Sequence, residues 1–235
     1  AYRGHNLAWS RQNPPWLTGP FTRDQRIQQL RDHITTVVGH YAGRVAQWDV
    51  VNEAFDGLQD PAHDPWAVTI GFPEYLDIAF RTAHTADPAA KLFYNDYNLE
   101  SANPKFDQVV DLVAGMKARG VPIDGIGFES HLGARSCNAS CTNATLKNML
   151  RAHALGLEVA ITELDVALPL PATPQALEQQ ASVYRSMLEA CLLAPNCHTF
   201  MTWGFTDKYS WIPSFIPGYG AALPFDEDYQ PKPAY

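Results

Sequence analysis

The sequence lacks any run of apolar residues long enough to cross a membrane, which takes about 18 or more. It also lacks low-complexity tracts and a basic segment followed by an apolar one, so we expect neither disorder nor a signal peptide in its 235 residues. Basic residues are few, 17 Lys and Arg against 25 Asp and Glu, and they form no stripe. Because nucleic-acid phosphates bind clustered Lys and Arg, this shortage argues against nucleic acid and favours a neutral ligand.

Cysteine is scarce as well. The four cysteines form two close pairs, Cys137 with Cys141 and Cys191 with Cys197. Such pairs suit two disulfides, four reduced core thiols or, with His131 beside the first pair, part of a zinc site. Two glycosylation sequons, at Asn138 and Asn143, lie in the same loop as the first pair, one between its cysteines and one just after Cys141. They favour a secreted, extracellular glycoprotein with disulfides and without a metal site.

Short apolar runs alternate with amphipathic segments along the chain, and no linker-like stretch divides it. We expect strands over 2–9, 45–51, 91–94, 125–128, 158–162 and 199–203. Three helices are expected between them. Their starts or ends are marked by a capping box of Thr22 and Gln25, by Gly120 and by Pro174. Their apolar faces would carry Ile27, Leu30, Ile34 and Val37; Phe106, Val109, Val110, Val113 and Met116; and Leu177, Ala181, Tyr184, Leu188 and Cys191.

Alternating strands and helices fit either an open doubly wound sheet or a closed (β/α)8 barrel. No glycine-rich phosphate loop follows the first expected strand, which weakens the nucleotide-binding alternative. Polar and aromatic residues instead collect after the strand ends, at Trp9, Asn52–Glu53, Asn95–Asp96, His131, Glu163 and Trp203. A barrel places its active site there. We therefore predict an α/β fold of the (β/α)8 TIM-barrel type, with six of its strands, in a single domain over 1–235.

Two apolar strands end in a carboxylate, one at Glu53 and one at Glu163. In a closed barrel both strand ends face one mouth, and two carboxylates flanking a sugar are the machinery of glycoside hydrolysis. One must be protonated to release the leaving oxygen, and the other must be ionised to attack. The alternative is two solvated glutamates with no role. Trp9, Trp203 and Trp211, with Tyr97 and Tyr209 nearby, favour the sugar site over ordinary core packing, because sugar C–H faces stack on flat rings.

The sequence resembles glycoside hydrolase family 10, the retaining endo-β-1,4-xylanases, and in particular its secreted fungal members. The matching segments are RGHNLAW (3–9), WDVVNEAF (48–55), LFYNDYN (92–98), IDGIG (123–127), SHL (130–132), VAITELDV (159–166), TWGFTDKYSWIP (202–213) and GYGAALPFDEDYQPKPAY (218–235). The likeness runs over nearly the whole chain. The resemblance also implies a disulfide between Cys191 and Cys197.

The resemblance implies a role for each matching residue. Glu53 would be the general acid/base, Glu163 the nucleophile, and Asn52 a hydrogen-bond partner of the sugar 2-hydroxyl. His131 and Asp165 would keep Glu163 ionised and oriented. The glycone subsites would be lined by His5, Trp9, Gln12, Trp203 and Trp211, and the leaving-group side by Tyr97 and Asn98.

Three features depart from the family pattern. The chain opens at what matches the third barrel strand, so two strands would have no counterpart in it. Glu129 stands where the family has Gln, adding a third carboxylate, and we expect a pH–rate profile different from that of Glu129→Gln. Ser10 follows Trp9 where members carry His, which predicts an altered grip on the glycone.

The predicted function is endo-1,4-β-xylanase, cutting internal β-1,4 bonds of xylan and xylo-oligosaccharides with retention of configuration. The chemistry needs no cofactor, and we expect a monomer without a membrane partner. Three alternatives remain: another retaining β-glycanase such as a cellulase, an inactive xylan-binding relic of the same fold, and an inhibitor or storage protein. The last ranks lowest because both carboxylates are present.

Overall fold

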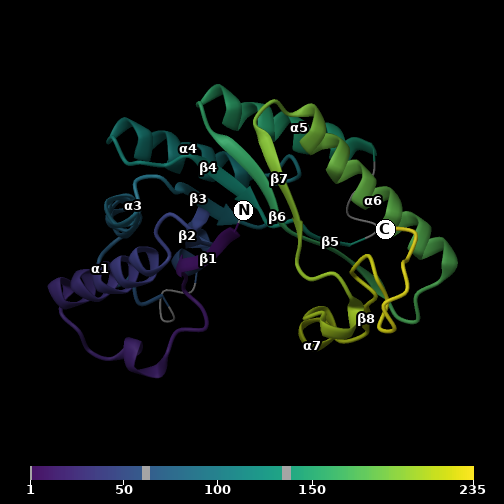
Figure 1. Ribbon diagram of the computed structural model, residues 1–235, viewed down its shortest axis with the longest axis horizontal. Coiled ribbons are helices and arrows are strands. Elements are labelled where there is room, and N and C mark those ends of the chain that lie inside the picture. The colour runs from purple at the N-terminus through teal and green to yellow at the C-terminus, as the bar shows by residue number, and fades with distance from the viewer. Residues whose placement is uncertain (1, 60–63, 134–138) are drawn as a thin grey trace. The chain divides into compact units, whose positions relative to one another are not determined.

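The computed structural model describes residues 2–59, 64–133 and 139–235, with the backbone alone described at 18, 57–59 and 139–141. The chain divides into two compact units, whose residues can be followed by colour in Figure 1. The N-terminal unit comprises Ala1–Asp96 and Gln108–Gly127, and the C-terminal unit comprises Tyr97–Asp107 and Phe128–Tyr235. Each unit is described by itself.

In the N-terminal unit, parallel strands alternate with helices. Its elements are β1 (Tyr2–Ala8), η1 (Pro15–Thr18), α1 (Arg23–His40), β2 (Val45–Asn52), α2 (Ala54–Gln59), α3 (Glu74–Ala86) and β3 (Lys91–Asp96), followed by most of α4 (Pro104–Ala118) and of β4 (Gly125–Phe128). The strand order is β1-β2-β3-β4, and β2 pairs in parallel with both β1 and β3. Residues of β3 and β4 are buried on both faces apart from Lys91, as parallel sheets require.

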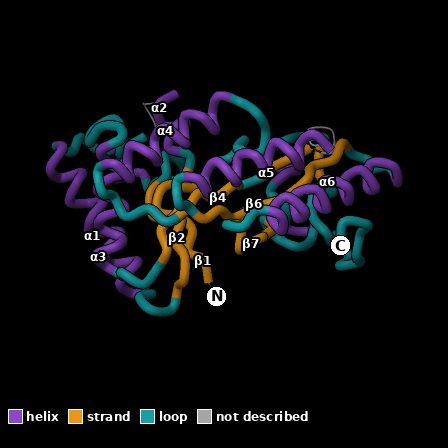
Figure 2. Tube along the Cα trace, turned by 90° about the horizontal axis from the view of Figure 1, so that it is seen from above, coloured by secondary structure: helices purple, strands orange, loops and turns teal. Residues whose placement is uncertain are grey.

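The first helix begins where its capping box predicts. Gln25 N–H donates to the Thr22 hydroxyl, and the Gln25 side chain accepts from the Thr22 N–H. The buried face of α1, however, follows a strict four-residue spacing, Arg26, Leu30, Ile34 and Val38, so the expected Ile27 and Val37 lie at its margins. Arg26 can be buried because its guanidinium lies over the Phe21 and Trp66 rings and donates to Gly19 O. Helices α1 and α3 lie side by side (Figures 1 and 2).

The C-terminal unit continues the alternation. Its elements are β5 (His131–Gly133), α5 (Ala139–Ala154), β6 (Glu158–Pro169), α6 (Pro174–Leu193), β7 (Cys197–Thr202), η3 (Asp207–Tyr209), α7 (Ile212–Phe215) and β8 (Tyr219–Gly220). Strand β6 is buried along nearly its whole length, and it pairs in parallel with β5 and β7 and antiparallel with β8. The short strands β5 and β8 were not expected, because neither carries enough residues to show a period.

The face of α6 agrees with the prediction only in part, at Tyr184 and Cys191, which are buried. Pro174 stands in its first turn as expected, after a Thr173 cap, but the buried residues include Gln180, Val183 and Met187, whereas Leu188 is 42% exposed. Helix α6 lies beside α5 (Figure 2) and also packs against β6, so it buries the stripe that faces both. No helix formed by the described residues combines the length and apolarity that crossing a bilayer demands.

Candidate active site

Glu53 is the first residue after β2, where the chain turns into α2. Its φ of +51° lies in the left-handed region that non-glycine residues seldom adopt. The turn is held by the neighbouring strand β3, because the Glu53 N–H donates to Asn95 O at 3.0 Å and the Ala54 N–H donates to the Tyr94 hydroxyl at 3.2 Å. Strand β3 thus fixes the backbone conformation of Glu53 at the end of β2.

The Glu53 carboxyl lies among groups of both signs. The Trp9 indole N–H donates to Glu53 Oε2 at 2.9 Å, and Arg11 Nε lies 3.9 Å from the same oxygen. Burial raises the pKa of Glu53, and the charges of Asp56 and Asp96 raise it further, whereas Trp9 and Arg11 oppose the shift. A carboxyl with a raised pKa retains its proton in less acidic solution, which suits a general acid.

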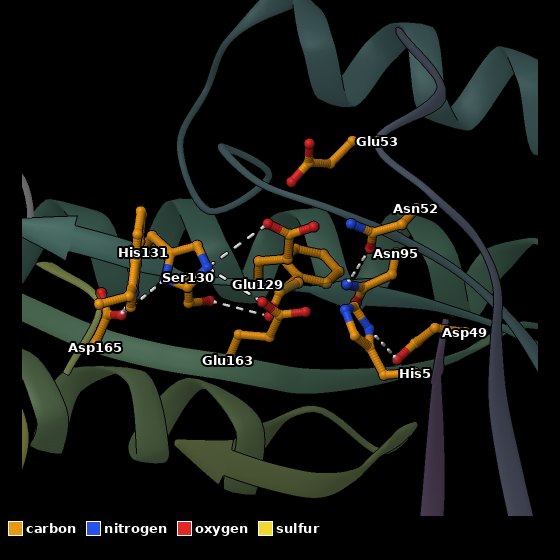
Figure 3. A network of polar contacts seen from close by, with 12 residues as sticks. His5, Asp49, Asn52, Glu53, Asn95, Glu129, Ser130, His131, Glu163 and Asp165 are labelled. Atoms are coloured by element: carbon orange, nitrogen blue, oxygen red, sulfur yellow. Dashed lines mark hydrogen bonds and ion pairs between the residues drawn. The ribbon is translucent and has the colours of Figure 1, made fainter. Parts of the chain in front are cut away.

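Two more contacts place predicted residues beside this strand end (Figure 3). Asn95 Nδ2 donates to Asn52 Oδ1 at 2.8 Å. His5 Nδ1 lies 3.2 Å from Asp49 Oδ2, and Arg3 pairs with the same carboxylate. Although burial opposes its ionisation, the Arg3 and His5 side chains hold the pKa of Asp49 below its usual range, so Asp49 anchors His5 as an anion.

In the C-terminal unit, His131 lies between carboxylates (Figure 3). His131 Nδ1 is 3.0 Å from Asp165 Oδ2, and Nε2 is 3.2 Å from Glu163 Oε2 and 3.8 Å from Glu129 Oε2. The parallel pairing of β5 with β6 sets His131 directly opposite Asp165. Trp211 Nε1–H donates to Asp165 Oδ2 at 2.8 Å, which fixes that carboxylate from the other side.

The charge of His131 follows from these partners. Burial alone would lower its pKa, but hydrogen bonds and charge interactions with Asp165 and Glu163 raise the pKa of His131 to about 9. The ring is therefore a cation at neutral pH, next to the carboxylate of Glu163. Glu129, which is 1% exposed, adds a further acidic group beside the same ring.

Glu53 and its partners thus belong to the N-terminal unit, and Glu163 with His131 and Asp165 belongs to the C-terminal unit. The whole chain, residues 1–235, matches the family model described as Glycosyl hydrolase family 10. The chain belongs to glycosyl hydrolase family 10. The match covers both units and both glutamates.

Curated relatives in family 10 come from bacteria and fungi alike. The chain is 46% identical over 234 residues to endo-1,4-beta-xylanase B of Thermotoga neapolitana, covering 99% of this chain and 66% of that protein. It is 42% identical to endo-1,4-beta-xylanase C of Phanerodontia chrysosporium, covering 99% and 58%. The chain thus spans less than two thirds of the length of these relatives.

Solved family 10 structures share the fold. Native xylanase 10B from Thermotoga maritima superposes with a TM-score of 0.92 at 45% identity, covering 99% of this chain and 71% of that one. Xylanase 10B from Thermotoga petrophila RKU-1, solved in complex with xylobiose, gives 0.93 at 44% identity, with the same coverage. The predicted fold class, the (β/α)8 TIM-barrel type, is confirmed, with this chain matching part of the barrel.

The remaining predicted sugar-binding residues lie in different surroundings, some against other side chains and some exposed. Trp203 and Trp211 both approach the His131 ring edge-on, with centroids 6.4 and 5.0 Å away. The Tyr97 ring lies under Lys105 Nζ at 3.3 Å. The remaining two, Gln12 and Asn98, are exposed and have left-handed φ values of 55° and 58°.

Sequence reasoning missed Arg11, Asp56 and Tyr94, which lie near Glu53. Arg11 and Asp56 contact each other at 3.2 Å, and Tyr94 donates to Asp96, a residue that the sequence did place after a strand end. Asp56 could have been found, since it follows Glu53 by one helical turn. Arg11 had no such signal, because a charged loop residue is ordinarily solvated.

The cysteine and sequon predictions have separate outcomes. The Cys191–Cys197 disulfide is present between α6 and β7. Cys137 and Asn138 lie outside the described residues, as does the Cys141 side chain, so their disulfide and glycan stay predictions. Asn143 is exposed on α5, and its sequon partner Thr145 is buried, with its hydroxyl donating to Glu100 O at 2.9 Å.

Glu129, His131 and Glu163 each offer one ligand-type atom, all within 4.8 Å of one another, a spacing compatible with a metal ion. Hydrolysis by two carboxylates does not require one. The same three groups already form an ion-pair network around the His131 cation, which accounts for their closeness.

Proposed function

We propose that this protein is a retaining endo-1,4-β-xylanase in which Glu53 is the general acid/base and Glu163 the nucleophile. One observation carries the assignment: the two glutamates have opposite electrostatic neighbours. Glu163 lies against a cationic His131, whereas burial and the nearby charges of Asp56 and Asp96 raise the pKa of Glu53. When the surroundings of two carboxyl groups push their pKa values apart, one can act as the acid and the other as the base or nucleophile.

In the first step, Glu163 attacks the anomeric carbon of the sugar and the glycosidic C–O bond breaks. The Glu53 proton passes to the departing oxygen, leaving a covalent glycosyl-enzyme. His131, held by Asp165 and Trp211, supplies positive charge beside the attacking carboxylate. Asn52, oriented by Asn95, is proposed to bond the sugar 2-hydroxyl.

In the second step, the Glu53 carboxylate takes a proton from water, and the water oxygen attacks the same carbon. The bond to Glu163 breaks, so the product keeps its original configuration and both carboxyls regain their starting state. This mechanism requires the two carboxyl groups to stand about 5 to 5.5 Å apart in the working enzyme.

The proposed substrate is the neutral backbone of xylan and its oligosaccharides. The net charge of −8 and the aromatic rings near each strand end suit an uncharged sugar chain. The xylobiose complex of the Thermotoga petrophila relative supports the same substrate class. His5, Trp9 and Gln12 are proposed to line the glycone side, with Trp203 and Trp211. Tyr97 and Asn98 are proposed on the leaving-group side.

We further propose one catalytic domain formed by both units, because the family model spans them. The protein would be an extracellular monomer carrying a glycan on Asn143. Since the Thr145 hydroxyl is buried and bonded, that glycan would have to be attached before α5 forms. Peptide mass spectrometry before and after endoglycosidase treatment, and light scattering of the secreted protein, test these statements.

The decisive experiment is proton NMR of a xylo-oligosaccharide digest during its first minutes. A β-anomer appearing first supports double displacement, and an α-anomer first overturns it. A 2-deoxy-2-fluoro-xylobioside with a good leaving group should label the Glu163 peptide in the wild type and fail to label Glu163→Gln. Xylan binding without turnover by the folded protein would instead indicate the binding relic.

A further inference from the structure

Glu53 has a left-handed backbone conformation that must be held by its surroundings, because a non-glycine residue with φ of +51° is strained. The two N–H groups at this turn, those of Glu53 and Ala54, donate to β3, to Asn95 O and to the Tyr94 hydroxyl. One of these two acceptors is therefore a side chain.

The Tyr94 hydroxyl can serve as an acceptor only if its proton is directed elsewhere. Tyr94 Oη donates that proton to Asp96 Oδ2 at 2.6 Å. Both residues are completely buried. The pKa of Tyr94 is well above its usual value, because of burial and the adjacent Asp96 charge, so the hydroxyl remains a neutral donor.

A phenylalanine at position 94 would fill the same space, and burying the Asp96 carboxylate is costly for folding. Core packing therefore explains neither polar group. Their arrangement instead forms a chain, from Asp96 to the Tyr94 hydroxyl to the Ala54 N–H, that ends at the residue after Glu53.

We propose that Tyr94 and Asp96 are a positioning pair for the acid/base glutamate. Tyr94 fixes the turn that aims Glu53, and Asp96 both orients Tyr94 and places a negative charge near the Glu53 carboxyl. This inference rests on the proposed function of Glu53 and adds to it the two residues through which β3 controls the acid step.

The Asp96 charge has a predictable effect on the pKa of Glu53. Burial is the main cause of the raised pKa of Glu53, and the Asp56 and Asp96 charges add to it, while the Trp9 hydrogen bond and Arg11 oppose it. Tyr75 also lies near Asp96, but as a neutral phenol with a pKa well above its usual value. Removing the Asp96 charge should therefore lower the pKa of Glu53.

The first test compares Tyr94→Phe with the wild type on two substrates. Unactivated xylotetraose needs a proton on its leaving group, whereas 2,4-dinitrophenyl β-xylobioside needs little acid assistance. General acid catalysis contributes roughly a hundredfold or more, so misplacing the acid should lower kcat/KM on xylotetraose about tenfold or more. On the dinitrophenyl substrate kcat/KM should change less than about twofold. An equal loss on both substrates would show a merely structural role and overturn the proposal.

The second test uses Asp96→Asn, in which the amide oxygen can still accept from Tyr94 but the charge is gone. The alkaline limb of kcat/KM should move to lower pH. Independently of activity, the Glu53 carboxyl carbon, assigned by its absence in Glu53→Gln, should titrate at lower pH by ¹³C NMR. An unmoved titration would contradict the charge part of the inference.

Two control variants test whether altering any buried polar group, wherever it lies, would have the same effects. Tyr184→Phe removes a buried hydroxyl that donates to Ala222 O, and Asp87→Asn alters a buried carboxylate that caps Gly43 and Ala89. Neither should alter the leaving-group dependence or the alkaline limb. If the wild type hydrolyses neither substrate, the proposed function fails. If it hydrolyses both and the variants behave like these controls, only the positioning pair fails.

Discussion

At the scale of single residues, neighbouring charges distinguish otherwise similar glutamates. Glu53 lies near two further carboxylates, while Glu163 faces His131 at 3.2 Å, with Asp165 on the far side of the ring. These neighbours come from other elements, so the same side chain acquires different acid–base behaviour through its contacts. Two measurements follow from the His131 network.

The first concerns stability and pH. The pKa of His131 is about 9 in the folded protein against 6.5 for a free histidine, so between these values the folded state binds more protons than the unfolded state. Its contribution, at most about 3 kcal/mol, is complete below pH 6.5 and is lost as pH rises through about 9. Urea unfolding at several pH values should show that the free energy of unfolding of His131→Gln falls less between pH 6.5 and about 9 than that of the wild type. The exposed His84→Gln should keep the wild-type slope, and a wild-type slope in His131→Gln would refute the linkage.

The second concerns Glu129, whose carboxylate lies 3.8 Å from His131 Nε2. Glu129→Gln removes one negative charge from beside the proposed nucleophile, so the acid limb of the pH–rate profile should move to lower pH. With less charge around His131, its stabilising effect should also be lost at a lower pH than in the wild type. Superimposable profiles for the two proteins would show that Glu129 has no electrostatic role.

At the scale of elements, caps were predicted correctly and faces unevenly. The face expected for α4 is confirmed, since Phe106, Val109, Val113 and Met116 are fully buried. The Thr22 cap and the Pro174 start depend on residues adjacent in sequence, and both are confirmed. In α1 and α6 the expected faces are only partly right: Leu30, Ile34, Tyr184 and Cys191 are buried as expected, and the other buried residues lie next to the expected ones in sequence. A helix with apolar residues on several sides has no unique face until its neighbours are in place.

Adjacent residues on α6 test this correction. Met187 is fully buried and Leu188 is 42% exposed. Met187→Ala should lower the free energy of unfolding by about 2 to 5 kcal/mol because it leaves a cavity. Leu188→Ala should cost less than about 1 kcal/mol. Chemical denaturation measures both, and a larger loss for Leu188→Ala would restore the face expected from sequence.

At the scale of the whole molecule, the Cys191–Cys197 disulfide closes a short loop, with a sequence separation of 6, between α6 and β7. A cross-link restricts the unfolded ensemble of the entire chain, and a loop this short contributes about 2 kcal/mol. The double variant Cys191→Ala/Cys197→Ala should lower the free energy of unfolding by that amount, measured without reductant. Adding reductant to the wild type gives the comparison, and an unchanged urea midpoint in the double variant would contradict the expectation.

Local residue patterns were enough to identify the family, the fold class and the approximate extents of five of the six expected strands, because strand ends and helix caps depend on residues adjacent in sequence. The strand expected over 158–162 instead continues to Pro169 as β6. The sequence also placed Glu53 directly after a strand, where the structure has it, since a parallel α/β fold presents strand ends to its site. Glu163 was expected just after a strand as well, but it lies within β6. The resemblance implied that His131 and Asp165 act on Glu163, and the folded chain supplied the distances that connect them. The support of the Glu53 turn by Tyr94 and Asp96 became evident from the tertiary structure alone. Hydrogen bonds and charge effects depend on distances of a few ångströms between different elements, and only the folded chain sets those distances.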